Sequence, residues 1–343
     1  MGDPAGIGPE VTVKALGGKE IPSGCIPVVI GDKRVLEKAL QTTGMEHCRL
    51  ETVTGIEKAE KRTDTIWVID LKNADPEQFE TGKVSSYCGK AAYEYIETAI
   101  RMALDREVDA TVTNPINKEA VNLAGFPYAG HTEIYAKLTG TPRYTMMLAY
   151  ENLMVVHVST HVSLQQACRL VKKERILEVI RIAEKACRQL GKEKPLIAVA
   201  GLNPHCGENG LFGNEELEEI APAVKMARKE GIQAEGPIPA DTVFSKACSG
   251  RYDIVVAMYH DQGHIPLKLL GFEYKDGGKE KNSICGINIT LGLPIIRTSV
   301  DHGTAFDIAG KGEASEESLV SAIKYAVTMA ESRERKGEGH ENG

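Results

Sequence analysis

Apolar and polar residues alternate along this chain in blocks that predict strands and helices in turn. Short apolar or β-branched runs, typical of buried strands, occupy residues 26–32, 64–71, 109–115, 152–160, 195–205, 252–260 and 293–300. Apolar side chains recur at helical spacing over residues 33–44, 89–108 and 164–191. This alternation predicts an α/β fold with a mainly parallel sheet and helices on both of its faces.

Polar segments recur at the carboxyl ends of these predicted strands. The segments are TNPINK, STH, NPHCGENG, YHDQGH and RTSVDHGT, and each follows a different strand. Ligands of open α/β sheets bind at the edge where parallel strands deliver their carboxyl ends. We therefore expect the functional residues to lie in these segments.

Length and charge limit the class of protein. At 343 residues the chain is long enough for about two domains of roughly 150 residues each, and its 42% hydrophobic content can form a core without disulfides. The net charge of −7, from 41 basic and 48 acidic residues, gives no basic footprint for nucleic acid. No apolar stretch is long enough to cross a bilayer. Neither nucleic acid nor a membrane is expected as a partner.

The eight cysteines are scattered, and none forms a C-x-x-C pair, which argues against a thiolate zinc site. Reduced thiols are typical of the cytoplasm, and no signal peptide is recognisable, so we expect a cytoplasmic protein. Cys206 lies in the polar segment NPHCGE, but a packing role is the simpler expectation for it.

Three histidines lie at three different strand ends: His161 in STHVSL, His205 in NPHCGE and His260 in YHDQGH. Three imidazoles with an open position can hold a catalytic divalent metal ion, and histidine suits zinc, cobalt or manganese better than calcium. A histidine at a strand end can equally be a hydrogen-bonded loop residue, and spacing alone leaves both interpretations open. His157 lies on a β-branched run, so we expect it to pack within the sheet rather than join the site.

Two glycine-rich segments differ in how specifically they indicate a bound ligand. MGDPAGIGPEVTVKAL is a loop leading into a helix, with Pro9 in the first turn, and is only a weak signal for anion binding. DHGTAFDIAGKGEAS, residues 301–315, resembles the nucleotide loop of the β-decarboxylating dehydrogenases that act on isocitrate and isopropylmalate. That resemblance implies binding of the adenosine half of NAD, with the ribose hydroxyls on Asp307. The cofactor residues it indicates are His302, Gly303, Thr304, Ala305 and Asp307.

Taken together, the motifs resemble the 4-hydroxythreonine-4-phosphate dehydrogenase family. The matching segments, which extend from residue 1 to about residue 315, are MGDPAGIGPE, TNPINKEA, GHTEIYA, STHVSL, GLNPHCGENGLFGNEE, GPIPADTVF, YHDQGHIPLK and INITLGLPIIRTSVDHGTAFDIAGKG. The resemblance implies an NAD-dependent oxidation of a secondary alcohol, followed by loss of the neighbouring carboxylate as CO2. It also implies an isocitrate/isopropylmalate dehydrogenase-like fold of two interlocked α/β/α domains with an active-site cleft between them.

The same resemblance assigns roles to single residues. The metal-ligand positions, for zinc, magnesium, cobalt or manganese, are those of His161, His205 and His260. The substrate positions are those of His131, Thr132, Lys268, Asn288 and Arg297. A phosphate group needs charged and neutral donors, and this set supplies both kinds. Asp241 and Lys118 are candidates for the proton acceptor, and Asp261 for a hydrogen-bond partner of His260.

We expect a first domain of residues 1–128 and 296–330, which carries the nucleotide loop, and a second of residues 129–295, which carries metal and substrate residues and dimer contacts. Residues 331–343 are polar and are expected to be disordered. The resemblance implies a homodimer whose site lies at the subunit boundary, with His260 as the residue expected to cross.

The sequence departs from the family pattern at three points. A short strand usually precedes MGDPAGIGPE, so a shortened start, or another segment in that sheet position, is expected here. A longer polar insertion, GFEYKDGGKEKNSICGI, separates Lys268 from Asn288, and His264 replaces an apolar residue. The last two features resemble the branch that converts D-threonate or D-erythronate 4-phosphate to dihydroxyacetone phosphate. His264 would then read the 2-hydroxyl of the substrate.

Three other functions remain as alternatives. The first is the vitamin B6 reaction, which gives 3-amino-2-oxopropyl phosphate from a substrate with a 2-ammonium group. A phosphate acyltransferase-like enzyme or a non-catalytic sugar-phosphate-binding protein would share part of the pattern. The combination of three histidines with DHGTAFDIAGKG argues against the latter two.

Overall fold

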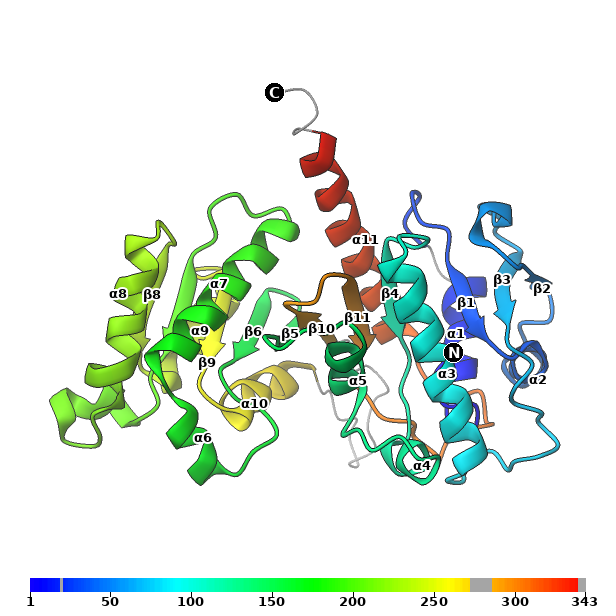
Figure 1. Cartoon of the computed structure of the whole chain (residues 1–343), viewed down its shortest axis with the longest axis horizontal. Coiled ribbons are helices and arrows are strands. Elements are labelled where there is room, and N and C mark those ends of the chain that lie inside the picture. Colours follow the sequence, from blue (N-terminus) through cyan, green and yellow to red (C-terminus); the bar gives the residue numbers. More distant parts are fainter. Residues whose placement is uncertain (19–20, 272–285, 339–343) are drawn as a thin grey trace. The chain divides into compact units, whose positions relative to one another are not determined.

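The computed structural model describes residues 1–18, 21–271 and 286–338, and these divide into two compact units (Figure 1). The first unit is built mainly from Met1–Pro142 and Leu293–Ala330, and the second mainly from the described part of Arg143–Glu273 with Asn288–Gly292. Residues 129–142, which the predicted division assigns to the second domain, belong here to the first unit. The reason is that Ile134 and Tyr135 are buried against Tyr93 and Ile96.

The first unit contains a small parallel sheet of strand order β1-β3-β2 and a separate parallel pair of β11 with β4. Its strands are β1 (Val28–Gly31), β2 (Arg49–Thr52), β3 (Thr65–Asp70), β4 (Ala110–Thr113) and β11 (Ile296–Val300). Its helices are α1 (Gly8–Gly18), α2 (Lys33–Thr43), η1 (Ile56–Lys58), α3 (Ser86–Leu104), α4 (Lys118–Leu123), α5 (His131–Leu138) and most of α11 (Glu317–Glu338).

Side-chain alternation explains the two layers of helices around the small sheet. On one face, Val29 of β1 and Val68 of β3 are buried with Val13 of α1 and Leu36 of α2. Because successive strand residues point to opposite faces, Ile30 packs on the other side, in a cluster with residues of α3. Each strand therefore needs apolar side chains on both faces, as its sequence provides.

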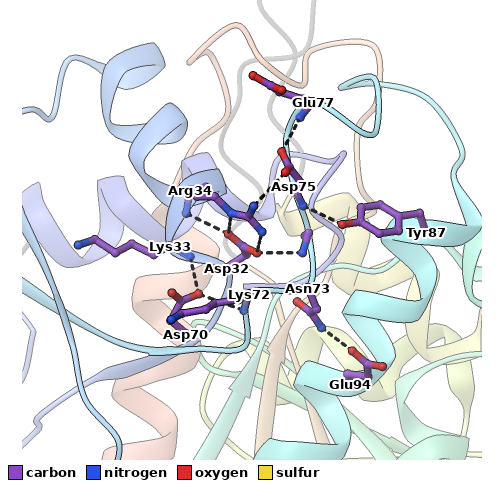
Figure 2. A network of polar contacts seen from close by, with 11 residues as sticks. Asp32, Lys33, Arg34, Asp70, Lys72, Asn73, Asp75, Glu77, Tyr87 and Glu94 are labelled. Atoms are coloured by element: carbon purple, nitrogen blue, oxygen red, sulfur yellow. Dashed lines mark hydrogen bonds and ion pairs between the residues drawn. The ribbon is translucent and has the colours of Figure 1, made fainter.

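Asp32, directly after β1, holds the start of α2 and the chain after β3 together (Figure 2). Its fully buried carboxylate caps α2 by accepting from the backbone N–H of Arg34, and it accepts further bonds from the Arg34 guanidinium and from the N–H of Ala74. Arg34 continues to Asp75 at 3.0 Å. Burial by itself raises the pKa of Asp32, but these hydrogen bonds outweigh it and hold that pKa below its ordinary value.

The second unit contains the strand order β10-β5-β6-β9-β7-β8, in which β5 and β6 are antiparallel while β6–β9, β9–β7 and β7–β8 are parallel. Its strands are β5 (Thr145–Tyr150), β6 (Leu153–His157), β7 (Ile197–Ala200), β8 (Ala234–Ile238), β9 (Ile254–Ala257) and β10 (Ile287–Leu291). Its helices are α6 (Leu164–Leu170), α7 (Lys173–Gln189), η2 (Pro204–Gly210), η3 (Glu216–Ile220), α8 (Ala221–Lys229), α9 (Ala240–Cys248) and α10 (His260–Gly271).

The central strands of this unit are buried along their whole length. Val255 and Ala257 of β9 pack with Val243 of α9 and Leu267 of α10 in one core cluster. The alternate residues Ile254 and Val256 are equally buried and therefore face the other side, where α7 contacts the strand. This explains why the sequence shows continuous apolar runs here rather than polar alternation.

The predicted α/β class with a mainly parallel sheet is confirmed. One predicted helix is divided, because Lys172 between α6 and α7 is extended at φ −126° and ψ 138°. α11 extends to Glu338, so residues 331–338 of the segment expected to be disordered are helical. Residues 272–285, which contain most of the polar insertion, and residues 339–343 lie outside the described residues. None of the helices in the described ranges combines the length and apolar composition needed to cross a bilayer.

Candidate active site

A cavity of about 310 Å³ lies in the first unit, where β4 and β11 end. Its lining comes from residues 113–116 and Lys118, from Gly130 and His131, and from residues 299–303. Because β4 and β11 are parallel neighbours, their carboxyl ends deliver the segments TNPINK and RTSVDHGT to one edge. The cavity thus brings together Lys118, His131, His302 and Gly303, four of the residues predicted from the sequence.

Arg297 and His131 give this region its electrostatic character. Arg297 on β11 is 3% exposed, donates to Thr113 Oγ1 at 2.7 Å and lies over the ring of Tyr135 at 5.5 Å. Burial lowers its pKa to about 10, so the guanidinium stays charged at neutral pH. The pKa of His131 lies well below its ordinary value. The main cause is burial of the ring, and the nearby positive charges of Arg297 and Lys118 add to it. A buried cation beside a neutral imidazole is a setting that favours an anionic ligand.

Several buried polar atoms around the cavity lack a hydrogen-bond partner among the residues that the structure describes. They include Nε2 of His131 and Oδ1 of Asn114, both from lining residues, and Oδ2 of Asp3. Buried polar atoms are nearly always satisfied in native proteins, so a ligand with complementary groups is expected here. Burial raises the pKa of Asp3 to about 6, against the opposing effect of its backbone hydrogen bonds.

The predicted nucleotide loop is held by α1. The Glu10 carboxylate accepts from the backbone N–H groups of Gly310 and, at 2.8 Å, of Gly312. Ile7 N donates to Thr304 O at 3.0 Å. The loop borders open space at Gly303, where an added Cβ would meet nothing within 4 Å, and it exposes the side chain of Asp307. The exposed carboxylate and open backbone are compatible with the adenosine half of NAD.

Four histidines gather in the second unit. His260 and His264, one turn apart at the start of α10, stack with ring centroids 3.5 Å apart. The ring of His161 lies 5.8 Å from that of His260, and the ring of His157 lies 4.8 Å from that of His264. His157 is fully buried, as predicted, and this burial, followed by the effect of His264, lowers its pKa to about 3. Its contact with His264 is a feature that the strand pattern did not reveal.

Buried side chains align the segments that carry these histidines. Gln262 accepts from Met258 N and donates to Gly201 O, both at 2.7 Å, and so joins the start of α10 to the end of β7. Ser159 Oγ donates to Met258 O at 3.1 Å. His260 Nδ1 is 2.7 Å from Asp261 Oδ1, which leaves Nε2 for another partner. Gln262 was not predicted as a site residue from the sequence, although its position between two predicted site histidines, His260 and His264, indicated such a role.

His205 lies in an unusual stretch of backbone. Residues 205–209 of η2 all have positive φ, between 44° and 77°. This backbone region is unfavourable for residues other than glycine. The buried carboxylate of Glu216 holds the preceding residues by accepting from the N–H groups of Leu202 and Asn203 at 2.7 Å. Strain maintained in this way is typical of functional segments.

The three predicted metal ligands do not form a complete site within one chain. Among residues 1–18, 21–271 and 286–338, no group of three or more His, Cys, Asp or Glu side chains is arranged to hold a metal ion. His161 and His260 lie near each other, but His205 does not complete a group with them. The three-histidine site therefore stays a prediction.

The remaining predicted residues lie in both units. Thr132 follows His131 in the first turn of α5. In the second unit, Lys268 lies in the last turn of α10, Asn288 donates to Met146 Sδ from β10, and Asp241 is exposed in the first turn of α9. Of the two candidate bases, only Lys118 borders the cavity of the first unit.

Comparison with known proteins identifies the family. The model of the family described as "Pyridoxal phosphate biosynthetic protein PdxA" matches residues 23–326. The chain belongs to the PdxA family. Its relatives include a D-threonate 4-phosphate dehydrogenase of Salmonella typhimurium, 48% identical over 96% of this chain and 97% of the relative. Another, of Cupriavidus necator, is 47% identical over 97% of this chain and 96% of the relative.

Solved structures agree with this membership. A 4-hydroxythreonine-4-phosphate dehydrogenase from Klebsiella pneumoniae is 46% identical and superposes with a TM-score of 0.84, covering 96% of this chain and 98% of its own. A protein with that name from Burkholderia phymatum is 43% identical with a TM-score of 0.82, covering 96% of each chain. This PdxA-family chain is accordingly a dehydrogenase, an oxidoreductase that acts on a CH–OH group.

Proposed function

We propose that this PdxA-family protein oxidises and decarboxylates a 4-phosphorylated four-carbon 3-hydroxy acid, D-threonate or D-erythronate 4-phosphate. The C3–H leaves as hydride to NAD, the 3-hydroxyl gives up its proton, and the C1–C2 bond of the 3-keto acid breaks. The products are NADH, CO2 and, after protonation of C2, dihydroxyacetone phosphate. The observation that carries this proposal is the 47–48% identity, over 96–97% of the chain, to relatives named D-threonate 4-phosphate dehydrogenase.

The first unit supports recognition of the phosphate. Arg297 offers a buried, charged guanidinium fixed by Thr113, and His131 offers an unpartnered ring nitrogen beside it. Phosphate favours charge-assisted bonds from arginine with neutral donors around it. In this proposal Lys268, Asn288 and Thr132 complete the substrate contacts. Lys118 and Asp241 are the two candidates for the group that takes the hydroxyl proton.

The loop at residues 301–312 is the proposed NAD site. NAD, when bound, supplies the hydride acceptor. Residues 302–305 would approach the cofactor through their backbone, and the exposed Asp307 would accept from the ribose hydroxyls. A carboxylate at this place favours NAD over NADP, because it would repel a 2′-phosphate.

A divalent metal ion, zinc, magnesium, cobalt or manganese, is also proposed at His161, His205 and His260. One chain does not group these three side chains, and the resemblance to the family implies a homodimer in which His260 of one subunit serves the other. In support, the second unit exposes large apolar side chains: Leu164, Leu211, Phe212, Ile265 and Leu269. Exposed apolar surface of this kind often marks a protein interface.

The described cysteines are all free, which supports a reducing compartment such as the cytoplasm.

His264 is the proposed reader of the substrate's 2-substituent. It is buried, it stacks on His260, and its Nδ1 lies 2.9 Å from His260 O, so that nitrogen donates to the carbonyl. Phosphate contacts cannot distinguish substrates that share a phosphate, whereas a group near carbon 2 can. A site that hydrogen-bonds a hydroxyl rejects an analogue lacking it far more strongly than a hydrophobic fit would.

The test is NADH formation at 340 nm with D-threonate 4-phosphate, D-erythronate 4-phosphate and 4-phosphohydroxy-L-threonine. The wild-type kcat/KM should be higher for one of the first two than for the third, and His264→Leu should lower that ratio. A wild-type preference for 4-phosphohydroxy-L-threonine would instead support the vitamin B6 reaction. That reaction is the second candidate because similar solved structures carry the name 4-hydroxythreonine-4-phosphate dehydrogenase.

A further inference from the structure

Glu10 is a buried side chain of α1 whose two carboxylate oxygens both serve the loop at residues 301–312. Oε2 accepts from Gly312 N at 2.8 Å, and Oε1 accepts from Gly310 N. Only 3% of the residue is exposed. Gly310 and Gly312 have φ of 81° and 70°, where glycine is favoured because it has no Cβ. The carboxylate therefore fixes the second half of the loop in a backbone conformation that requires glycine at these two positions.

The first half of the loop also follows the segment that leads into α1. Ile7 N donates to Thr304 O at 3.0 Å, and a Cβ at Gly6 would lie only 3.0 Å from the Thr304 Cβ. Beyond the loop, Lys14 Nζ donates to Ala314 O at 2.5 Å. α1 and its lead-in thus contact the loop or its end at successive points along the chain.

Residues 81 and 82 pack against the loop at two further places, near Phe306 and near Gly310. A Cβ at Gly82 would lie 2.7 Å from Phe306 O, and one at Gly310 would lie 3.1 Å from Thr81 Cγ2. Gly82 N in turn donates to Ala5 O at 2.8 Å. The loop is therefore packed between two segments, while Asp307 keeps its side chain exposed for a ligand.

We propose that Glu10 is a positioning residue for the cofactor, which holds the 301–312 loop in the conformation that binds the adenosine half of NAD. This inference rests on the proposed NAD dependence. A loop that is already ordered loses less conformational entropy when it binds a ligand. Removing the carboxylate should therefore weaken NAD binding and leave the phosphorylated substrate unaffected, because Glu10 contacts the loop and not Arg297 or His131.

The experiment compares Glu10→Gln with Glu216→Gln as a matched control. Glu216 is equally buried and also accepts two backbone N–H groups, but it does so in the second unit. Gln keeps one oxygen acceptor and turns an NH2 group toward the other N–H. The dissociation constant for NAD, measured by calorimetry, should rise about tenfold in Glu10→Gln and less than twofold in the control. The KM for NAD should rise in parallel, with kcat at saturating NAD nearly unchanged.

A second measurement uses no cofactor. Amide hydrogen exchange at residues 303–312 should become faster in Glu10→Gln and stay unchanged in Glu216→Gln. If wild type binds NAD and Glu10→Gln binds it equally well, the inference is overturned and the proposed function stands. If wild type does not bind NAD, the proposed cofactor is wrong, and this role for Glu10 fails with it. Equal weakening in both variants would also overturn the inference, since the cause would be a general loss of stability.

Discussion

At the scale of single residues, the candidate site residues include several buried ionisable groups. Arg297, His131 and His157 are all buried, and each has a pKa shifted in the direction that burial imposes on a base. The two histidines are therefore neutral near pH 7, whereas Arg297 remains charged because its pKa stays about 10. The first unit thus holds a fixed positive charge that does not vary over the physiological pH range.

Replacing Arg297 with Lys should weaken binding of the phosphorylated substrate. Lys keeps a positive charge but loses the planar fork and the bond to Thr113 Oγ1. The KM for the substrate should rise about 10- to 100-fold, as expected for roughly 1.5–3 kcal/mol from a hydrogen bond to a charged group. Arg175→Lys is the control, because Arg175 bonds two backbone carbonyls and Glu178 in the second unit. An equal rise in KM for both variants would contradict the assignment.

His161→Ala should lower both bound metal and turnover if the proposed metal site is correct. We expect metal content, measured by elemental analysis of the purified protein, to fall well below that of wild type, with the fold retained in circular dichroism. His47→Ala provides the comparison, because His47 is an exposed histidine outside the site. Full metal content together with full activity in His161→Ala would rule this ligand out.

At the scale of secondary-structure elements, buried carboxylates hold the segments around the site. Asp32 joins the start of α2 to the chain after β3, Glu10 holds the 301–312 loop, and Glu216 holds the residues before His205. Each accepts backbone N–H groups that would otherwise have no partner in the interior. Loops at strand ends are thereby kept in defined conformations without regular secondary structure of their own.

Asp32→Asn should destabilise the protein by about 1–3 kcal/mol at neutral pH, the range expected for buried hydrogen bonds to a charged group. Because the folded-state pKa of Asp32 is lowered, its contribution is present above the ordinary carboxyl pKa of about 4 and is lost as pH falls below it. The difference between wild type and variant in urea unfolding should therefore shrink below pH 4. The exposed Asp64→Asn is the control. A pH-independent difference would show that ionisation of Asp32 contributes nothing.

At the scale of the whole molecule, the two units carry different parts of the predicted chemistry. The cavity, Arg297 and the proposed NAD loop belong to the first unit, whereas the histidine cluster belongs to the second. The second unit also exposes apolar side chains on α10, which begins with His260. The proposed homodimer accounts for this exposure and for the incomplete group of metal ligands in one chain.

Leu269→Glu should convert the proposed dimer into monomers and reduce activity. Leu269 is 78% exposed and lies four residues after Ile265, so the two side chains share one face of α10. Light scattering at micromolar concentration should report the mass of one chain, about 37 kDa. Leu123→Glu, at a comparably exposed leucine of the first unit, should remain dimeric. A wild-type monomer with full activity would refute the assembly.

The amino-acid sequence by itself determined the fold class and named the candidate site residues. Buried parallel strands need apolar side chains on both faces, so their runs, such as 197–200 and 254–257, could be recognised without a structure. Polar residues at the ends of such runs must lie at the carboxyl edge of the sheet, which placed His161, His205, His260 and the 301–315 segment within a few candidate motifs. His131 and Arg297 were assigned by the resemblance to the family. Short edge strands such as β2 and β8 lack this signal and were not predicted, and neither were the strands β5 and β10.

Only the tertiary structure decided which of these residues meet. The pairing of β4 with β11 joins segments about 180 residues apart into one cavity, and no local pattern encodes that neighbourhood. The contact of His157 with His264 and the bonds from Glu10 to Gly310 and Gly312 likewise depend on long-range packing. Sequence periodicity records which face of an element is buried. The partner of that face is set by the packing of the whole chain, because burial favours contact with apolar surface of any origin.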